Sequence, residues 1–391
     1  MYNKNISILI IGMGISGTGF GEFLKKQNFN VFYYDDKLNP ILYTNVDYVY
    51  FSPGIHEYSQ IYTQIAKLGI PQINDFDYFY SKFQGKIIAV SGTAAKTTTC
   101  ELLKHLMPEA GMCGNMGIDI FQEIDKAIVI MEISSKQLER TQYFAADYAI
   151  LTNIAVDHGD SHTSTEAYLS AKKNIFRINN KKQFFLTGKE YIKHFPKIHC
   201  HTHINLTNLQ IEKLKKINAN LIQKHNLINV ENAITMVQEI KNTNVDDIIN
   251  DLKYFKLPKF RQEVFHWKNK IIINDSKCTN ITSCMAAMEN YNEFIWMAGG
   301  LLKNKYFDYN FNDILKYKSK IKEAIFFGKH KDIFFDFFQS YFPCTLIELK
   351  DSLHFIEKSN ANTILFSPIG QSLDEFKNYV ERGLFFKNLF H

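Results

Sequence analysis

Residues 91–99 constrain the fold of this 391-residue chain more than any other segment. Their sequence is Ser-Gly-Thr-Ala-Ala-Lys-Thr-Thr-Thr. An apolar run, 87–90, precedes them, and residues 100–106, which have helical periodicity, follow. A strand, a glycine-containing turn, Lys-Thr and a helix form the layout of a nucleotide phosphate loop, in which backbone N–H groups face the phosphates. The loop is irregular, because Ala95 stands where glycine normally precedes the lysine.

In a loop of this kind the polar residues have distinct tasks. Lys96 would reach the outer phosphates, and the Thr97 hydroxyl would hold Mg²⁺. The alternative is a turn that binds nothing, because Gly-Thr-rich turns are common. The motif alone does not decide between the two.

Length and composition bound the remaining possibilities. A chain of this length accommodates two or three domains. With 46% hydrophobic and 22% charged residues, it can build both a core and a polar surface. The net charge of +5 comes without a long basic run, so nucleic-acid binding is not implied.

The cysteines and the apolar runs indicate in which cellular compartment the protein is expected. None of the six cysteines forms a CxxC pair, which favours reduced thiols in a cytosolic protein. The N-terminal apolar run ends in a glycine-rich turn, so no signal peptide is expected. No run of 18 apolar residues exists, so no membrane span is expected either.

The first of three alternating α/β units spans residues 1–84. Its first strand is followed directly by residues 12–17, Gly-Met-Gly-Ile-Ser-Gly, and its second strand ends at Asp35-Asp36. This G-x-G-x-x-G pattern, with an acidic residue about 20 positions on, is typical of nucleotide-binding turns. A third strand leads into Ser52-Pro53-Gly54-Ile55. The alternative is a tight turn that needs glycine only for close packing.

The second unit, residues 85–258, contains the phosphate loop. Two further apolar strands end at Glu132 and before a polar segment that contains His158. Ligands bind beyond the carboxyl ends of parallel strands, so these two residues would lie beside Lys96 and Thr97. A carboxylate suits a hard cation beside a triphosphate, and an imidazole is a less typical neighbour. Alternatively, Glu132 is a surface charge and His158 an ordinary loop residue.

Two other features of the second unit are less informative. Lys172 lies on a predicted helix, where its spacing alone favours an ordinary solvated lysine. The cluster of His199, Cys200, His201 and His203 suggests a metal site, but its alternation indicates one strand or hairpin, and no second ligand cluster is evident.

The third unit, residues 259–391, alternates strands and helices again, with a helix predicted at 372–381. Three of its strand ends carry polar groups: Asn-Asp-Ser-Lys at 274–277, Gly-Gly followed by Lys303, and Ser367-Pro368. These groups suggest a second ligand-binding edge. Ordinary helix caps favour the same residue types, so both interpretations stay open.

Taken in order, these segments resemble the Mur ligases, the ATP-dependent amino-acid ligases of peptidoglycan synthesis. Residues 92–98 are similar to the family's phosphate loop, 132–139 to its E-x-S-S-F-Q-L-E segment and 274–280 to its NDSKATN segment. Residues 168–172 match Y-x-x-AK, which carries a carbamylated lysine in the family. The ending at 367–383 resembles SPxxxSxDxF…RG and points to the members that add D-glutamate.

The resemblance implies an α/β fold of three domains. These are a Rossmann-like UDP-substrate domain at 1–84, a central P-loop ATPase-like domain at 85–258 and a Rossmann-like amino-acid-binding domain at 259–391. The implied reaction joins D-glutamate to UDP-N-acetylmuramoyl-L-alanine, using ATP and Mg²⁺, through an acyl phosphate. We further expect a cytoplasmic monomer whose domains close around the substrates.

The resemblance also implies site residues. The catalytic residues would be Lys96, His158 and a carbamylated Lys172. The ATP contacts would be Gly92, Thr93, Lys96, Thr97, Thr98, Asn226, Asn229, Arg261, Asp275 and Lys277. The substrate contacts would be Ile15, Ser16, Asp35, Asp36, Ser52, Asn115, Lys303, Ser372, Leu373 and Tyr379. The metal contacts would be Thr97, Glu132, His158 and Lys172.

Several positions depart from the family pattern. Ala94 and Ala95 replace Asn and Gly in the phosphate loop, and Lys136 replaces an aromatic residue. A β-carbon at position 95 is tolerable if φ is negative and costs about 1–2 kcal/mol if φ is positive. Two other functions therefore stay open: an impaired ligase-like protein that only binds the UDP-muramyl substrate, and a ligase of the same fold for another amino acid.

Overall fold

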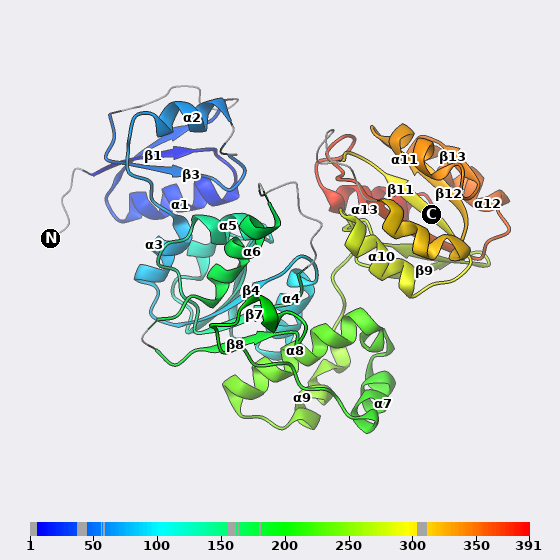
Figure 1. Cartoon of the computed structure of the whole chain (residues 1–391), viewed down its shortest axis with the longest axis horizontal. Coiled ribbons are helices and arrows are strands. Elements are labelled where there is room, and N and C mark those ends of the chain that lie inside the picture. The colour runs from blue at the N-terminus through cyan, green and yellow to red at the C-terminus, as the bar shows by residue number, and fades with distance from the viewer. Residues whose placement is uncertain are drawn as a thin grey trace. The chain divides into compact units, whose positions relative to one another are not determined.

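The computed structural model describes residues 6–36, 45–55, 57, 59–154, 162, 164–179, 181–302 and 311–391, with the side chains of residues 224 and 225 excepted. The chain divides into two compact units (Figure 1). The first structural unit is drawn from residues 6–255, which cover most of the predicted units 1–84 and 85–258. The second structural unit is centred on residues 256–391, close to the predicted unit 259–391. The predicted α/β class is confirmed, because parallel sheets and helices alternate in both units.

A three-stranded parallel sheet opens the first unit, in the order β2-β1-β3. Its elements are β1 (Ser7–Ile11), α1 (Ile15–Lys26), β2 (Asn30–Tyr34), β3 (Tyr48–Phe51), α2 (Gln60–Ala66) and α3 (Asp75–Lys82). Successive strand side chains point to opposite faces. Ile8 and Ile10 therefore pack with α1 and α3, whereas Leu9 and Ile11 pack with α2. Figure 1 shows α1 and α2 on opposite sides of these strands.

The second sheet of this unit has five parallel strands in the order β5-β6-β4-β7-β8. The strands are β4 (Lys86–Ser91), β5 (Gly111–Gly114), β6 (Ile128–Glu132), β7 (Tyr148–Leu151) and β8 (Phe184–Thr187). The helices are α4 (Lys96–Leu106), α5 (Ser135–Arg140), α6 (Thr165–Lys173), α7 (Asn208–Ile217), α8 (Lys224–Lys241) and α9 (Val245–Asp251). The central strand β4 lies between β6 and β7, so the segments that follow these three strands meet at one edge.

The second unit is built on a six-stranded sheet in the order β13-β12-β11-β14-β10-β9, in which only the edge strand β9 is antiparallel to its neighbour. The strands are β9 (Glu263–Trp267), β10 (Lys270–Asn274), β11 (Phe294–Gly299), β12 (Ile321–Phe327), β13 (Cys344–Leu346) and β14 (Thr363–Ile369). The helices are α10 (Ile281–Glu289), α11 (Lys331–Phe338), α12 (Ser352–Lys358) and α13 (Tyr379–Asn388). One face packs against α10 and α11, and the other against α12 and α13.

The predicted start of the helix at 372–381 is wrong. Residues 372–378 form a turn, in which the Phe376 N–H donates to the Ser372 carbonyl, and α13 begins only at Tyr379. Asn378 caps this later start, since its side chain accepts from the N–H groups of Val380 and Glu381. Within this turn the Asp374 carboxylate accepts the Lys329 N–H at 2.9 Å, which joins the turn to another loop.

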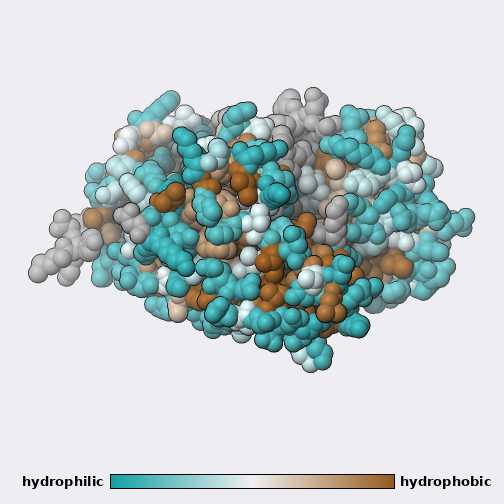
Figure 2. Space-filling view, turned by 60° about the horizontal axis from the view of Figure 1, so that its bottom comes forward, coloured by the Kyte–Doolittle hydropathy of each residue, from teal (hydrophilic) through white to brown (hydrophobic). Residues whose placement is uncertain are grey.

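In the part of the chain that the structure describes, no helix has the length and apolar character needed to cross a bilayer. Polar side chains cover most of the face drawn in Figure 2, and apolar side chains gather there in a few patches.

Candidate active site

The predicted phosphate loop connects β4 to α4 and is held by the segment that follows β7. Gly92 has a φ of 153°, and a β-carbon there would lie 1.9 Å from Thr152 Oγ1, so only glycine fits. Thr152 Oγ1 donates to the Ala94 carbonyl at 2.7 Å, and the Ala94 N–H donates to Asn153 Oδ1 at 2.9 Å. Both backbone polar groups of Ala94 are therefore bonded to the segment that follows β7.

Ala95 occupies the N-cap of α4 in the left-handed conformation, with a φ of 66°. Lys96 begins the helix, and its Nζ donates to the Gly92 carbonyl at 2.8 Å and to the Thr93 carbonyl at 3.3 Å. The ammonium group thus lies over the loop, beside the N-terminus of α4. Both features attract anions such as phosphate.

Glu132 is the carboxylate of this site. It is 3% exposed; Thr97 Oγ1 donates to its Oε2 at 2.6 Å, and Asn115 Nδ2 donates to its Oε1 at 3.1 Å. A carboxylate and a hydroxyl in contact are the oxygen donors that Mg²⁺ prefers, so these residues fit such an ion. The predicted third contact, His158, lies outside the described residues. Within the described ranges no group of three His, Cys, Asp or Glu residues is arranged to hold a metal.

Lys172 is buried rather than solvated, contrary to what its spacing alone favoured. It is 2% exposed, and its Nζ donates to Ser91 Oγ at 3.1 Å, at the end of β4. Burial, and then the positive charge of Lys96, hold the pKa of Lys172 well below its usual range, against the opposing effect of Glu132. Its amine is therefore much less basic than that of an exposed lysine. The ring of Tyr168 lies 5.3 Å from Nζ.

The remaining predicted ATP contacts of the first unit are buried. Thr93 Oγ1 forms a 2.6 Å hydrogen bond with the Tyr168 hydroxyl, and Thr98 lies inside α4. Asn226 and Asn229 are buried on α8, where Asn226 Nδ2 donates to the Asn220 carbonyl.

The glycine-rich turn lies at the end of β1. Ser52 Oγ donates to the Gly12 carbonyl at 2.6 Å, and the Met13 N–H donates to Asp35 Oδ2 at 3.1 Å. A β-carbon at Gly17 would lie 2.0 Å from the Gly12 carbonyl oxygen, so close packing requires glycine there. A cavity of about 560 Å³ adjoins the turn and includes Ile15, which is 58% exposed. Ser16 lies on α1, and Asp36 accepts from the Tyr34 hydroxyl.

Within residues 256–391 the predicted site residues lie on three loops and at the start of α13. Asp275 is 4% exposed and accepts from Ser367 Oγ at 3.1 Å, and burial raises its pKa well above the usual range. Lys277 Nζ lies 5.3 Å from the Tyr379 ring. Ser372 is buried, Leu373 is 60% exposed and Arg261 is partly exposed, whereas Lys303 lies outside the described residues.

Sequence reasoning gave no structural role to two buried or half-buried arginines. Arg382 is 1% exposed and donates from Nε and Nη2 to Ser276 and from Nη1 to the Gly370 carbonyl, which joins two of the three loops. Arg140 donates to the backbone carbonyl of Phe51 at the end of β3 and to those of Ser52 and Ile55 in the segment that follows. Neither role has a local signal, because the partners are mostly backbone carbonyls, 12 or more positions away in sequence.

The predicted histidine cluster has mainly packing contacts. The rings of His199 and His201 meet edge to face with centroids 4.8 Å apart, and His201 stacks on Phe184. His203 Nε2 lies 3.6 Å from a carboxylate oxygen of Glu231.

Comparisons with known proteins match this geometry to a family. The Mur ligase middle domain matches residues 90–228. A UDP-N-acetylmuramoylalanine–D-glutamate ligase of Rickettsia bellii is 27% identical, and the alignment covers 100% of this chain and 98% of that protein. The enzyme of the same name from Aquifex aeolicus is 29% identical, with 98% of each chain covered.

A solved structure of MurF ligase from Thermotoga maritima, in complex with ADP, has a TM-score of 0.59 at 13% identity and covers 100% of this chain and 96% of that chain. At this identity the likeness shows the fold alone, and it confirms the predicted Rossmann and P-loop architecture. The domain boundaries at 84 and 258 stay predictions. The chain carries a Mur ligase middle domain and is related along its full length to the D-glutamate ligases, so the predicted resemblance to the Mur ligase family is confirmed.

Proposed function

We propose that this protein is an ATP-dependent ligase that joins D-glutamate to UDP-N-acetylmuramoyl-L-alanine in peptidoglycan precursor synthesis. The observation that carries the proposal is the phosphate loop beside the contact between Thr97 and Glu132, in a chain whose full-length relatives bear that enzyme's name. The relatives favour neither a binding protein without turnover nor a ligase for another amino acid.

The first step transfers the γ-phosphoryl group of ATP to the alanyl carboxylate of the UDP-linked substrate. Phosphoryl transfer needs positioning and charge neutralisation more than covalent help. Lys96 supplies a positive charge and the α4 N-terminus supplies N–H donors, both on a loop fixed by Thr152 and Asn153. The D-glutamate amine then attacks the acyl phosphate, and phosphate leaves.

Thr97 and Glu132 would hold Mg²⁺ in this proposal, together with His158 and Lys172. The ion, when bound, offsets the negative charge of the phosphates. In the structure Glu132 is oriented by hydrogen bonds from Thr97 and Asn115, which keeps its oxygens at the loop.

Lys172 acts as a carbamate in the proposal. A neutral amine can attack carbon dioxide, whereas an ammonium cannot, and the lowered pKa of Lys172 favours the neutral form. The new C–N bond converts the side chain into an anion once the proton leaves. Such an anion, beside Lys96 and the Ser91 hydroxyl, would suit a metal ion better than an ammonium would.

The other predicted contacts complete the proposal. The UDP-linked substrate would be bound by Ile15, Ser16, Asp35, Asp36, Ser52 and Asn115. ATP would be contacted by Thr98, Asn226, Asn229, Arg261, Asp275 and Lys277. D-Glutamate would be held by Lys303, Ser372, Leu373 and Tyr379. The proposal includes a cytoplasmic monomer, and all six cysteines are free thiols, as in a reducing compartment.

Phosphate release tests the proposal directly. Purified protein is given ATP, Mg²⁺ and UDP-N-acetylmuramoyl-L-alanine, with and without D-glutamate. We expect release that depends on both substrates in the wild type and is abolished in Lys96→Ala, whose thermal unfolding should stay cooperative. The control is Lys104→Ala on the same helix, which should keep wild-type turnover. Wild-type protein without substrate-dependent release, or an active Lys96→Ala protein, would refute the proposal.

A further inference from the structure

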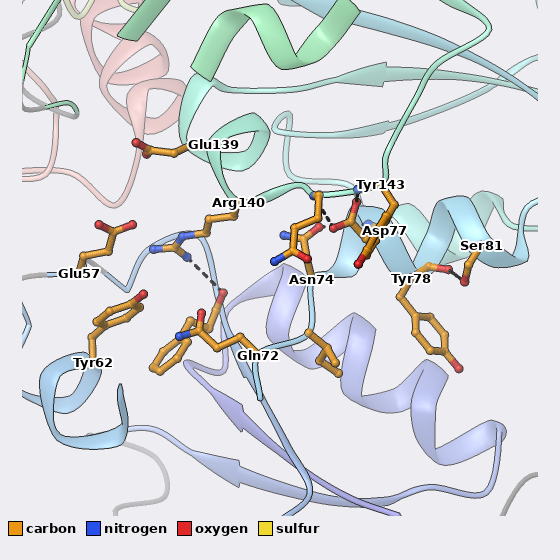
Figure 3. A pocket seen from close by; sticks show the side chains of 13 residues that line it. Glu57, Tyr62, Gln72, Asn74, Asp77, Tyr78, Ser81, Glu139, Arg140 and Tyr143 are labelled. Carbon is orange, nitrogen blue, oxygen red and sulfur yellow. Dashed lines mark hydrogen bonds between the residues drawn. The ribbon is translucent and has the colours of Figure 1, made fainter. Parts of the chain in front are cut away.

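Arg140, the last residue of α5, joins this helix to the segment that follows β3. Its Nη1 donates to the carbonyls of Phe51 and Ser52, each at 3.3 Å, and its Nη2 donates to the carbonyl of Ile55 at 2.6 Å. Figure 3 shows the side chain leaving α5 and its guanidinium pointing toward Tyr62 and Glu57. One side chain thus binds three carbonyls of a five-residue segment.

The chemistry of arginine suits this task. A guanidinium group is planar and rigid and has five N–H donors, so a single side chain can serve three carbonyls in a fixed arrangement. Phe51 is also paired with Ile11 in the sheet, the Ser52 N–H donates to the Ile11 carbonyl, and the Ile55 N–H donates to the Ser52 carbonyl. Arg140 therefore fixes the course of residues 51–55 after the edge strand β3.

This segment in turn fixes the glycine-rich turn. Ser52 Oγ donates to the Gly12 carbonyl at 2.6 Å, and a β-carbon at Gly12 would lie 3.1 Å from Ser52 Cβ. Ile15 and Ser16, two predicted contacts of the UDP-linked substrate, begin α1 directly after this turn. A displacement of residues 51–55 would reach the turn through Ser52.

The other end of α5 is anchored beside the phosphate loop. The Ile133 N–H donates to the Val90 carbonyl of β4, and Ser134 and Gln137 form a capping box that starts α5. Arg140 therefore projects from a short helix held at the nucleotide edge of the five-stranded sheet.

We propose that Arg140 is a positioning residue for the UDP-linked substrate, which it serves by holding residues 51–55 and, through Ser52, the glycine-rich turn in their binding conformation. The identity of that ligand rests on the proposed function. A second contact joins the segment after α5 to α3: the Asp77 carboxylate accepts the N–H groups of Gln142, Tyr143 and Phe144 at 2.7–2.9 Å. Loss of Arg140 should therefore loosen the segment without unfolding the unit.

Arg140→Ala tests the proposal by separating the kinetic constants. We expect the KM for UDP-N-acetylmuramoyl-L-alanine and its calorimetric Kd to rise by roughly tenfold or more, because charge-assisted hydrogen bonds to the segment are lost. The KM for ATP and the kcat should change by less than about twofold, since the phosphate loop is untouched. If Arg140 were merely structural, its loss would instead impair kcat and the KM for both ATP and the UDP-linked substrate together, or reduce the fraction of active protein.

Arg177→Ala is the matched control. Arg177 is also partly buried and donates to the carbonyls of Thr141 and Phe144 and to Thr141 Oγ1, but makes no recorded contact with residues 51–55. It should lower thermal stability and leave the KM for the UDP-linked substrate at the wild-type value. An equal rise of this KM in both variants would overturn the proposal.

The cavity beside Arg140 permits a chemical rescue. Arg140 lines a cavity of about 500 Å³ together with Phe51, Tyr62 and Glu57. Removal of its side chain leaves room for a small cation to reach the three carbonyls. Millimolar methylguanidinium should lower the raised KM of Arg140→Ala several-fold, whereas tetramethylammonium, which has no N–H donor, should not.

The outcomes separate this inference from the proposed function. Wild-type protein without phosphate release or binding of the UDP-linked substrate would refute the function. Active wild-type protein with an unchanged KM in Arg140→Ala would overturn the role of Arg140 alone. If the alanine variant does not fold, Arg140→Lys takes its place. It keeps the charge but not the planar fork, so its KM should also rise, and a wild-type KM would overturn the proposal.

Discussion

Ala95 is the residue at which the departure from the family's phosphate loop has a measurable structural consequence. Its φ of 66° places a β-carbon in the left-handed region, which costs an L-residue about 1–2 kcal/mol relative to glycine. Glycine loses more backbone entropy on folding, and this loss offsets part of the gain. Ala95→Gly should therefore raise the free energy of unfolding by about 0.5–1 kcal/mol, measured by urea denaturation.

Ala94→Gly, one position earlier, is the control for this prediction. Ala94 is not among the described residues with a positive φ, so glycine there should destabilise the protein. The same pair tests function: if the β-carbon of Ala95 hinders phosphate, only Ala95→Gly should lower the KM for ATP. Equal effects of the two substitutions would show that the strain at position 95 is harmless.

The burial of Lys172 could not be predicted from the local sequence. Its spacing on α6 favoured a solvated side chain, whereas the structure buries it against Ser91, a residue 81 positions earlier. Only tertiary contacts create that environment, and only the family resemblance pointed toward it. Arg140 is a similar case, because its partners are carbonyls of residues 85–89 positions earlier.

Lys172→Ala should be nearly inactive if the lysine acts as a carbamate at the metal. Acetate or another short carboxylic acid should restore part of the phosphate release, because it replaces the missing anion in the space left by the side chain. Lys173→Ala is the control, since Lys173 is the exposed neighbour on the same helix and its loss should cost almost nothing. A fully active Lys172→Ala protein would contradict the prediction.

At the scale of elements, the inner strands of the sheets were predicted, whereas the outer strands β5, β8, β9 and β13 were not, and one helix start was misplaced. The apolar runs before the phosphate loop and before Glu132 are strands because each is buried on both faces of a parallel sheet. The start of α13 was misplaced because a turn and a helix share the same local preferences at residues 372–378. In the structure the Asp374 carboxylate accepts a backbone N–H of a distant loop, a contact that the local sequence does not reveal.

The first turn of α3 holds a carboxyl group that should make stability depend on pH. Asp75 is buried beside the Tyr50 hydroxyl, and burial raises its pKa from 3.8 to about 6. Because the folded state holds this proton more tightly, the stability from Asp75 is complete below pH 3.8 and is lost as the pH rises through about 6. Above that range the buried charge costs up to about 3 kcal/mol.

Asp75→Asn removes this charge and can still accept the hydrogen bond from Tyr50. Its free energy of unfolding at pH 7.5 should exceed that of the wild type by about 1–3 kcal/mol, and the gain should vanish near pH 4. Asp247→Asn, in the exposed first turn of α9, is the control and should give no such gain. Chemical denaturation at both pH values measures the difference, and a variant less stable at pH 7.5 would contradict the prediction.

At the scale of the whole molecule, the two units have separate hydrophobic cores. The six-stranded sheet is covered on both faces by residues of its own unit, with α10 and α11 on one face and α12 and α13 on the other. A domain with two complete layers of helices around one sheet can fold by itself. We therefore expect the fragment 256–391 to fold alone, which would also test the predicted boundary at 258.

Tryptophan fluorescence measures the unfolding of the second unit separately from that of the first. The chain has two tryptophans, Trp267 on β9 and Trp296 on β11, so both report on the second unit. The urea midpoint seen by fluorescence should be the same in the fragment and in the full chain, whereas circular dichroism of the full chain should also report the first unit. A fragment that begins at residue 275 is the control: it lacks β9 and β10, which exposes an edge of the central strand β14, and it should not fold. An unfolded 256–391 fragment would show that the second unit depends on the first for its stability.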